Sequence, residues 1–344
     1  MSAAAFELPA RLEAHEPPEA RGLRRDEVRL MVASRSDGRI VHTRFSELPS
    51  FLAPGDLVVV NTSATLPAAV PAGREDGTML ELRLSTPVPQ RSTDFRVVEL
   101  RSAGGSPFPG TFAGERLALP AGGSAELLAR YADGRRLWLA QLELPEAVGP
   151  YLHRYGQPIR YGYVHRPWPL EAYQNAYAGE AGSSEMASAG RPFTPELVTR
   201  LVAEGVLVAP ITLHTGVSSP EQHELPSPEH YRVPAKTARL VNAVHGWGGR
   251  VLAVGTTVVR ALESAAEPDG TVGGGAGWTN LVVTPQRGLW TVDGVVSGWH
   301  EPQASHLGLL RAAAGDELLD RCYRAALAEG YLWHEFGDSH LVLP

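Results

Sequence analysis

The chain contains two kinds of hydrophobic pattern, and their order along the sequence restricts the fold more than any other feature. Between roughly residues 63 and 148, short segments are patterned like strands that have one solvated face. They lie at 79–84, 95–100, 125–128 and 137–142. Turns rich in glycine and proline separate these segments. This spacing predicts a small antiparallel β-barrel or sandwich.

Strands and helices alternate in the later part of the chain. Thr194 is placed to cap a helix that has Pro195 at its first position and ends before Gly205. The elements predicted after it are one strand through 206–208 and 211–214, further strands at 250–254, 281–283 and 341–343, and helices at 234–245, 258–263 and 304–329. Together with a buried strand predicted at 56–60, this alternation predicts an α/β domain with a largely parallel sheet.

Composition excludes several classes of protein. The net charge of −7 provides no overall basic field for nucleic acid, although it is compatible with a local basic patch. A single cysteine excludes an intrachain disulfide framework and a cysteine-rich metal centre. No pair of histidines has a recognised metal-binding spacing, so we predict no metal. With no window of about 18 apolar residues and no signal peptide, the chain is expected to be cytoplasmic, without membrane contact.

The turn Gly255-Thr256-Thr257 lies between a predicted strand and a predicted helix. Backbone amides in the first turn of a helix attract anions, and threonine hydroxyls add hydrogen-bond donors. Ligands of α/β proteins bind at this end of the sheet. Arg260 and Glu263 follow on the helix and would share one face. The alternative is an N-cap threonine pair with a surface ion pair, and spacing alone favours that alternative.

Two histidines are candidates for chemistry. His214 closes a predicted strand, and His300 follows Trp299. An imidazole at the end of a strand can transfer protons or hydrogen-bond a sugar. For each of them, a buried imidazole with satisfied hydrogen bonds is the alternative. We expect His230 to lie in a solvated loop and Cys322 to lie in the core side of a helix.

The order of several motifs resembles that of the S-adenosylmethionine:tRNA ribosyltransferase-isomerases of queuosine biosynthesis over nearly the whole chain. The most complete match has the form G-T-T-x-x-R-x-L-E and runs from Gly255 to Glu263. The segment from Tyr173 to Ser183 has the form Y-Q-x-x-Y-A-x-E-x-G-S. Further matches in the family's order are Phe6-Glu7-Leu8-Pro9, Asn61 with Leu66-Pro67-Ala68, Thr212-Leu213-His214 with Gly216, Gly277-Trp278-Thr279, Val292-Asp293-Gly294, His300 and Gly337-Asp338.

The resemblance implies an α/β (α+β multidomain) protein. A mainly parallel α/β domain, residues 1–62 and 149–344, would bind S-adenosylmethionine and carry an inserted antiparallel β-barrel, residues 63–148. The implied enzyme transfers and isomerises the ribosyl moiety of S-adenosylmethionine onto 7-aminomethyl-7-deazaguanine at the tRNA wobble position. Its products are epoxyqueuosine, adenine and methionine. S-adenosylmethionine is then a co-substrate, and the anticodon region of tRNA is the expected partner.

The resemblance and the chemistry of this reaction assign roles to the matched residues. The sulfonium acidifies the neighbouring C5′ hydrogens, so that a base can begin the reaction, and departing adenine needs a proton donor. The candidates for proton transfer are His214 and Glu263. The candidates for binding S-adenosylmethionine, whose carboxylate needs amides or a cation, are Thr212, Gly255, Thr256, Thr257 and Arg260. The candidates for binding the acceptor are Tyr177, Glu180, Ser183, Glu229 and His300.

The chain departs from the family motifs at several polar positions. N-D-T-R appears as Asn61-Thr62-Ser63-Ala64, and T-A-G-L-H-F-T has Pro192 in place of its histidine. M-H-x-E keeps Glu229 but has Ser227 where histidine is expected. Other motifs differ at Ser218, Ser219, Pro220 and Gln303.

These losses of polar groups leave two alternatives to the tRNA reaction open, because proline and alanine replace neither histidine nor arginine chemically. One is a divergent enzyme that applies related elimination chemistry of S-adenosylmethionine to a small molecule or another RNA. The other is a non-catalytic homologue that retains the ligand pocket.

Overall fold

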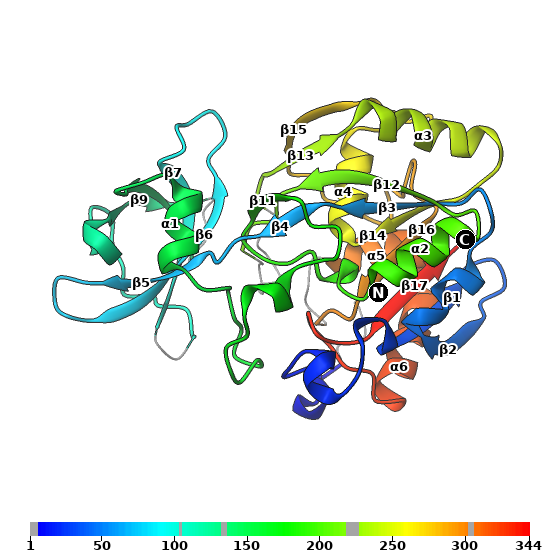
Figure 1. The fold of residues 1–344 in the computed structure, drawn as a ribbon, viewed down its shortest axis with the longest axis horizontal. Helices are drawn as coiled ribbons and strands as arrows, with labels where there is room; N and C mark the ends of the chain where they lie inside the picture. Colours follow the sequence, from blue (N-terminus) through cyan, green and yellow to red (C-terminus); the bar gives the residue numbers. More distant parts are fainter. Residues whose placement is uncertain (1–5, 103–104, 132–135, 218–226, 302–305) are drawn as a thin grey trace.

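A computed structural model of the chain describes residues 6–102, 105–131, 136–217, 227–301 and 306–344. Figure 1 shows two parts side by side, a β-barrel and a larger α/β part. The strands of the larger part are β1 (Arg29–Ser34), β2 (Ile40–Arg44), β3 (Leu57–Asn61), β4 (Ser63–Thr65), β11 (Glu180–Ser183), β12 (Leu207–Leu213), β13 (Glu229–Val233), β14 (Val251–Val254), β15 (Gly275–Thr279), β16 (Gly294–Gly298) and β17 (Ser339–Leu343).

The large sheet has the strand order β15-β13-β12-β3-β14-β16-β17-β1-β2. Its central strands β12, β3, β14 and β16 run parallel to one another, and β17 runs parallel to β1. The pairs β15–β13, β13–β12, β16–β17 and β1–β2 are antiparallel. The predicted α/β class is confirmed, but the sheet is mixed rather than largely parallel. Parallel pairing is found mainly at the centre, where both faces are covered.

Burial on both faces explains the continuous apolar run in β3. Leu57 and Val59 pack on the face that is covered by α3, α4, α5 and α6, whereas Val58 and Val60 pack on the face that is covered by α2 and η4.

The helices are α1 (Val148–Tyr155), α2 (Pro195–Ala203), α3 (Ala235–Gly246), α4 (Thr256–Ser264), α5 (His306–Ala314) and α6 (Asp316–Ala328). The 3₁₀ helices are η1 (Ala10–Leu12), η2 (Pro18–Arg21), η3 (Arg25–Glu27), η4 (Phe45–Phe51), η5 (Pro120–Gly122), η6 (Leu170–Tyr173) and η7 (Ser188–Gly190).

Most of the predicted elements are present. Thr194 caps α2 as predicted, because its hydroxyl accepts a hydrogen bond from the backbone N–H of Leu197 at 3.1 Å. Cys322 is buried in the core of the α/β part. The strand predicted at 281–283 was wrong, since the last strand of that edge is β15. The N–H and carbonyl of Leu281 bond to the side chains of Thr279 and Arg260 rather than to a neighbouring strand.

The barrel is closed, with strand order β10-β7-β6-β5-β8-β9. Alternate side chains such as Leu82, Val98 and Leu127 fill its interior. Its strands are β5 (Ala69–Gly73), β6 (Met79–Pro87), β7 (Phe95–Ser102), β8 (Arg116–Ala118), β9 (Ser124–Arg130) and β10 (Leu137–Glu143). Helix α1 lies beyond the predicted barrel boundary at 148, yet its Tyr151 and Leu152 pack into the barrel core. We therefore propose that the barrel unit extends through α1.

One carboxylate on the outer face of the barrel is fully buried among arginines. The side chain of Glu99 is 0% exposed, and it lies 2.7 Å from Arg101 and 2.6 Å from Arg136. Arg83, which is also buried, lies 3.8 Å from it and stacks over the ring of Tyr161 in the segment that follows α1. Removing the carboxylate would leave these guanidinium groups buried without their shared counter-charge.

Glu99→Ala is therefore expected to lower the free energy of unfolding by about 3–5 kcal/mol, the usual cost of breaking a buried ion pair. The matched control is Glu143→Ala, because Glu143 is 63% exposed and pairs with the exposed Arg116. The control should cost less than about 1 kcal/mol. Urea unfolding of both variants measures these losses. A loss for Glu99→Ala as small as that of the control would show that the buried cluster is not needed for stability.

Candidate functional site

Several of the predicted site residues lie at one edge of the large sheet. Because β12, β3, β14 and β16 are parallel, their carboxyl ends meet at the same edge. His214 follows β12, Thr62 follows β3, Gly255 follows β14 and His300 lies just beyond β16. Crevices outside the carboxyl ends of parallel strands are the usual ligand sites of open α/β sheets. The sequence motifs are therefore brought together by the strand order.

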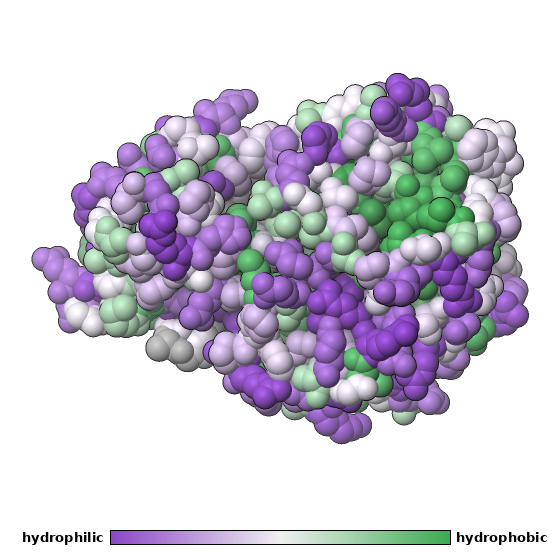
Figure 2. All heavy atoms as spheres, viewed as in Figure 1, coloured by the Kyte–Doolittle hydropathy of each residue, from purple (hydrophilic) through white to green (hydrophobic). Residues whose placement is uncertain are grey.

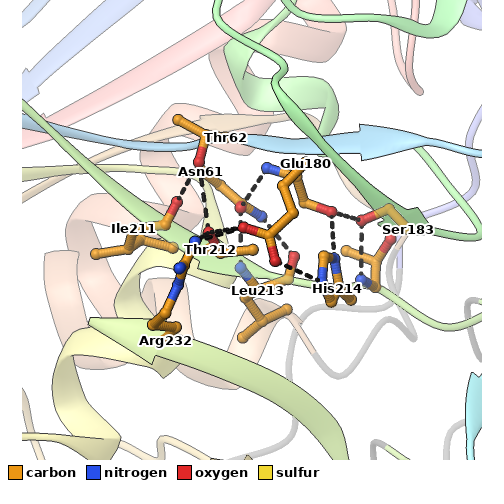
Figure 3. A network of polar contacts seen from close by, with 11 residues as sticks. Asn61, Thr62, Glu180, Ser183, Ile211, Thr212, Leu213, His214 and Arg232 are labelled. Atoms are coloured by element: carbon orange, nitrogen blue, oxygen red, sulfur yellow. Dashed lines mark hydrogen bonds and ion pairs between the residues drawn. The ribbon is translucent and has the colours of Figure 1, made fainter. Parts of the chain in front are cut away.

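The side chain of Asn61 ties the end of β3 to the end of β12. Its amide donates to the carbonyl of Leu213 at 2.9 Å and accepts from the N–H of Leu213 at 3.0 Å. Ser63 then lies 2.7 Å from Nδ1 of His214 and 2.7 Å from the hydroxyl of Ser183. Figure 3 shows this network. The imidazole of His214 is consequently held at a fixed place and in a fixed orientation.

The other imidazole nitrogen of His214 faces a carboxylate. Nε2 lies 3.6 Å from Oε1 of Glu180, which is 48% exposed and also pairs with Arg232. Thr212 joins the group, because its hydroxyl lies 3.2 Å from Arg232 and 3.5 Å from Glu180 (Figure 3). Burial lowers the pKa of His214, and the nearby Glu180 opposes that shift. His214 is thus neutral near pH 7 and has an acceptor beside it for an added proton.

Glycine is required at position 182 for this arrangement. A Cβ there would lie only 2.4 Å from Nδ1 of His214. The G-S at the end of the matched segment therefore has a local reason: Gly182 admits the imidazole, and Ser183 hydrogen-bonds the hydroxyl that holds it.

The first turn of α4 offers a second set of donors at the same edge. Gly255 has φ +90°, a conformation that favours glycine, and a Cβ there would come within 3.3 Å of Ala189. Oγ1 of Thr257 is buried and has no hydrogen-bond partner among the described residues. The amides of Thr256 and Thr257 begin the helix, so they suit an anionic group.

Arg260 and Glu229 are engaged with each other. A guanidinium nitrogen of Arg260 donates to Glu229, and its other nitrogens donate to the carbonyls of Leu281 and Thr279, each at 3.2 Å. Glu229 also accepts from the N–H of Gly216 at 3.0 Å. The pair therefore links α4 to β13 and to the turn after His214. These contacts favour a positioning role over the direct ligand contacts expected for both residues.

Glu263 is a buried structural carboxylate in this geometry. Its side chain is 0% exposed and lies 2.7 Å from Arg287. It also accepts from the backbone N–H groups of Trp290, Thr291 and Val292 at 3.0–3.3 Å. Every oxygen is occupied by donors that hold one loop. The surface ion pair with Arg260 is absent, because each of these two residues has another partner, and the expected proton-transfer role has no geometric support.

The remaining candidates, Tyr177 and His300, contact residues other than those around His214. Tyr177 has a buried hydroxyl without a partner among the described residues, and it lies so close to Gly190 that a Cβ there would meet the hydroxyl at 2.0 Å. Burial raises its pKa. His300 hydrogen-bonds Ser297 at 2.9 Å and stacks on His306 with ring centres 4.6 Å apart. Burial holds the pKa of His300 well below its usual range.

Sequence reasoning missed two neighbours of His214. Arg232 and His230 both lie on β13, so the solvated loop expected for His230 was wrong. His230 packs between His214 and Trp278. The alternating pattern of residues 229–233 is the signal that would have predicted this strand. Ser218, Ser219, Pro220 and Gln303 lie outside the described residues.

Within the described ranges, no group of three or more histidine, cysteine, aspartate or glutamate side chains is arranged to hold a metal ion. In the same part of the chain, no helix is long and apolar enough to cross a membrane.

Comparisons with known proteins agree with the motif order. A family model described as "Queuosine biosynthesis protein" matches residues 1–342. The chain is 37% identical to the S-adenosylmethionine:tRNA ribosyltransferase-isomerase of Symbiobacterium thermophilum, over 98% of each chain. It is 38% identical to the enzyme of that name from Thermus thermophilus, over 96% of this chain and 97% of the other. A crystal structure of S-adenosylmethionine tRNA ribosyltransferase from Thermotoga maritima matches with a TM-score of 0.55 at 30% identity, covering 99% of this chain and 100% of that one.

The contacts of Glu263 predict a stability defect that a surface carboxylate would not have. Glu263→Ala should lower the free energy of unfolding by about 3–5 kcal/mol, because it leaves Arg287 and several backbone N–H groups buried without an acceptor. Glu180→Ala, at a position that is 48% exposed, should cost less than about 1 kcal/mol. Urea unfolding compares the two, and a stable Glu263→Ala protein with lost activity would instead support the proton-transfer role.

Buried histidines predict loss of stability in acid. Burial lowers the pKa of His340 to about 3 and that of His306 to about 4. Below pH 6.5 these imidazoles bind protons in the unfolded chain but stay neutral in the folded protein. The free energy of unfolding therefore falls as the pH falls. Each such group contributes up to about 1.4 kcal/mol per pH unit. Unfolding measured from pH 7.5 to 5 should show a smaller slope for His340→Phe, whereas the exposed control His153→Phe should keep the wild-type slope.

Proposed function

The chain belongs to the S-adenosylmethionine:tRNA ribosyltransferase-isomerase family of queuosine biosynthesis, and from this premise we propose that it catalyses that family's reaction. The ribosyl moiety of S-adenosylmethionine is transferred and isomerised onto 7-aminomethyl-7-deazaguanine at the tRNA wobble position. The products are epoxyqueuosine, adenine and methionine. The observation that carries this proposal is the relationship over nearly the full length of the chain at 37–38% identity.

His214 is our candidate for the base that begins the reaction. Its lowered pKa leaves it neutral, and therefore able to accept a proton, near pH 7. The proton would come from C5′, which the sulfonium acidifies. The base form that we propose donates Nδ1–H to the Ser63 hydroxyl, which leaves the lone pair on Nε2 to take the proton. Glu180, beside Nε2, would stabilise the imidazolium that forms.

The first turn of α4 is our candidate for binding the methionine carboxylate. The amides of Thr256 and Thr257 and the unpartnered hydroxyl of Thr257 are donors at the positive end of a helix. Arg260 acts through Glu229 and the turn at Gly216, so it positions the residues around His214 rather than touching the carboxylate. Thr212 and Ser183 have the same supporting role toward Glu180 and Ser63.

The segment that departs from N-D-T-R still contributes a side chain to the candidate site around His214. Ser63, which stands in the altered segment, supplies the hydroxyl that orients His214. Arg232, a half-exposed arginine on β13, forms an ion pair with Glu180 in the same part of the site. The tRNA named as the substrate of the full-length relatives supports a tRNA substrate, bound through its anticodon region. A tRNA acceptor also favours the cytoplasmic location expected from the sequence.

Adenine release tests the proposal directly. The wild-type protein should release adenine and methionine from S-adenosylmethionine only when tRNA carrying the aminomethyl-deazaguanine precursor is present, with epoxyqueuosine formed in the tRNA. His214→Ala should lower turnover about 10²- to 10⁴-fold, the usual contribution of a general base. His153→Ala, at an exposed position on α1, is the control. Mass spectrometry measures all three products.

Two results would contradict this proposal. Binding of S-adenosylmethionine without tRNA-dependent release of adenine would reject the tRNA reaction and favour a different acceptor. Full turnover by His214→Ala would reject the assignment of the base while leaving the reaction in place.

A further inference from the structure

Three aromatic rings form a row across the edge of the large sheet. The N–H of His214 donates to the carbonyl of His230 at 3.0 Å, and His230 lies directly opposite Trp278 on β15. The rings of His214 and His230 are nearly parallel, with their centres 6.2 Å apart. The rings of His230 and Trp278 have their centres 5.5 Å apart and their planes at 73°. The row therefore begins at the candidate base and ends at the outermost strand of the sheet.

The same face of these strands also carries Arg232, whose ion-pair partner is Glu180. Thr212 pairs with Arg232, and Arg232 pairs with Ala276, two residues along each strand from the aromatic row. Successive side chains alternate between faces, so both rows lie on one face. Leu213 and Tyr231 turn to the other face and pack on the core. On the open face, Trp278 is 37% exposed and the side chain of Arg232 is 51% exposed.

This combination suits an unpaired nucleobase. Single-stranded RNA is bound by stacking its bases on aromatic side chains, while arginine contacts the phosphates. We propose that Trp278 is a stacking platform for an unpaired base of the RNA substrate, and that Arg232 contacts the adjoining backbone. This inference rests on the proposed function and adds to it a surface that binds the anticodon loop.

The position of Trp278 favours RNA over the adenine of S-adenosylmethionine. Strand β15 is separated from β14 by β13, β12 and β3. Trp278 therefore lies on the outermost strand of the sheet, whereas the methionine carboxylate is proposed to bind at the first turn of α4, which follows the central strand β14. The aromatic row leads outward from His214 to the sheet edge, so a polymer can follow it while its modified base stays near His214.

Separate binding measurements for the two substrates test the platform. Trp278→Ala should weaken tRNA binding about 5- to 150-fold, the range for losing one base–aromatic stack. Trp278→Phe should retain most of the affinity, because a smaller aromatic face remains. Affinity for S-adenosylmethionine, measured calorimetrically, should stay unchanged, as should the melting temperature. The slope of tRNA affinity against salt concentration should also stay unchanged, because no charge is removed.

Trp290→Ala is the matched control. Trp290 is 38% exposed, and its indole stacks with Arg287 rather than with the aromatic row. The affinity of the Trp290→Ala protein for tRNA should equal that of the wild type. Wild-type tRNA affinity in Trp278→Ala would overturn the inference while leaving the proposed function intact. A loss of S-adenosylmethionine affinity with tRNA affinity unchanged would also overturn it, since the platform would then serve the adenine. Failure of the wild-type protein to bind tRNA would reject the proposed function as well.

Discussion

The paired hydrogen bonds between Asn61 and Leu213 are the contact on which the site depends. They join the ends of two adjacent parallel strands at the point where the chain leaves the sheet toward the barrel (Figure 1). Because Ser63 follows Asn61 and His214 follows Leu213, this one contact brings a hydroxyl and an imidazole together at 2.7 Å. A change in the pairing of these strands would separate them, since each residue of register is worth about 3.3 Å.

Burial separates the charged groups of the protein into two kinds. Glu99 and Glu263 are fully buried, and each is surrounded by donors that it holds in place. Glu180 and Arg232 are about half exposed, at the carboxyl edge of the sheet. A buried ion pair cannot exchange its partner for a ligand without a large desolvation cost, whereas a half-exposed pair can. Figure 2 shows that polar side chains also cover much of the remaining surface on one face of the molecule, beside an apolar area at its right.

Strong periodic segments were predictable one by one. The helix capped by Thr194 and the buried strand at 56–60 follow from local hydrogen bonding and from apolar runs, and both are present. The strand predicted at 281–283 failed because the side chains of Arg260 and Thr279 take the backbone groups of Leu281. No local pattern contains that information, because the competing partners arrive from other segments.

The sequence by itself determined the family, the α/β class and the motifs that meet at one sheet edge, because these depend on the order and local pattern of residues. Tertiary structure decided which motif residues are half exposed at that edge and which are buried. Glu180 and His214 are 34 positions apart and meet because β11, which carries Glu180, pairs with β4, whose Ser63 bonds His214. Glu263, within the most complete motif, is buried against a loop. Local pattern cannot distinguish these cases, since burial and charge partners depend on which strands are neighbours in the sheet.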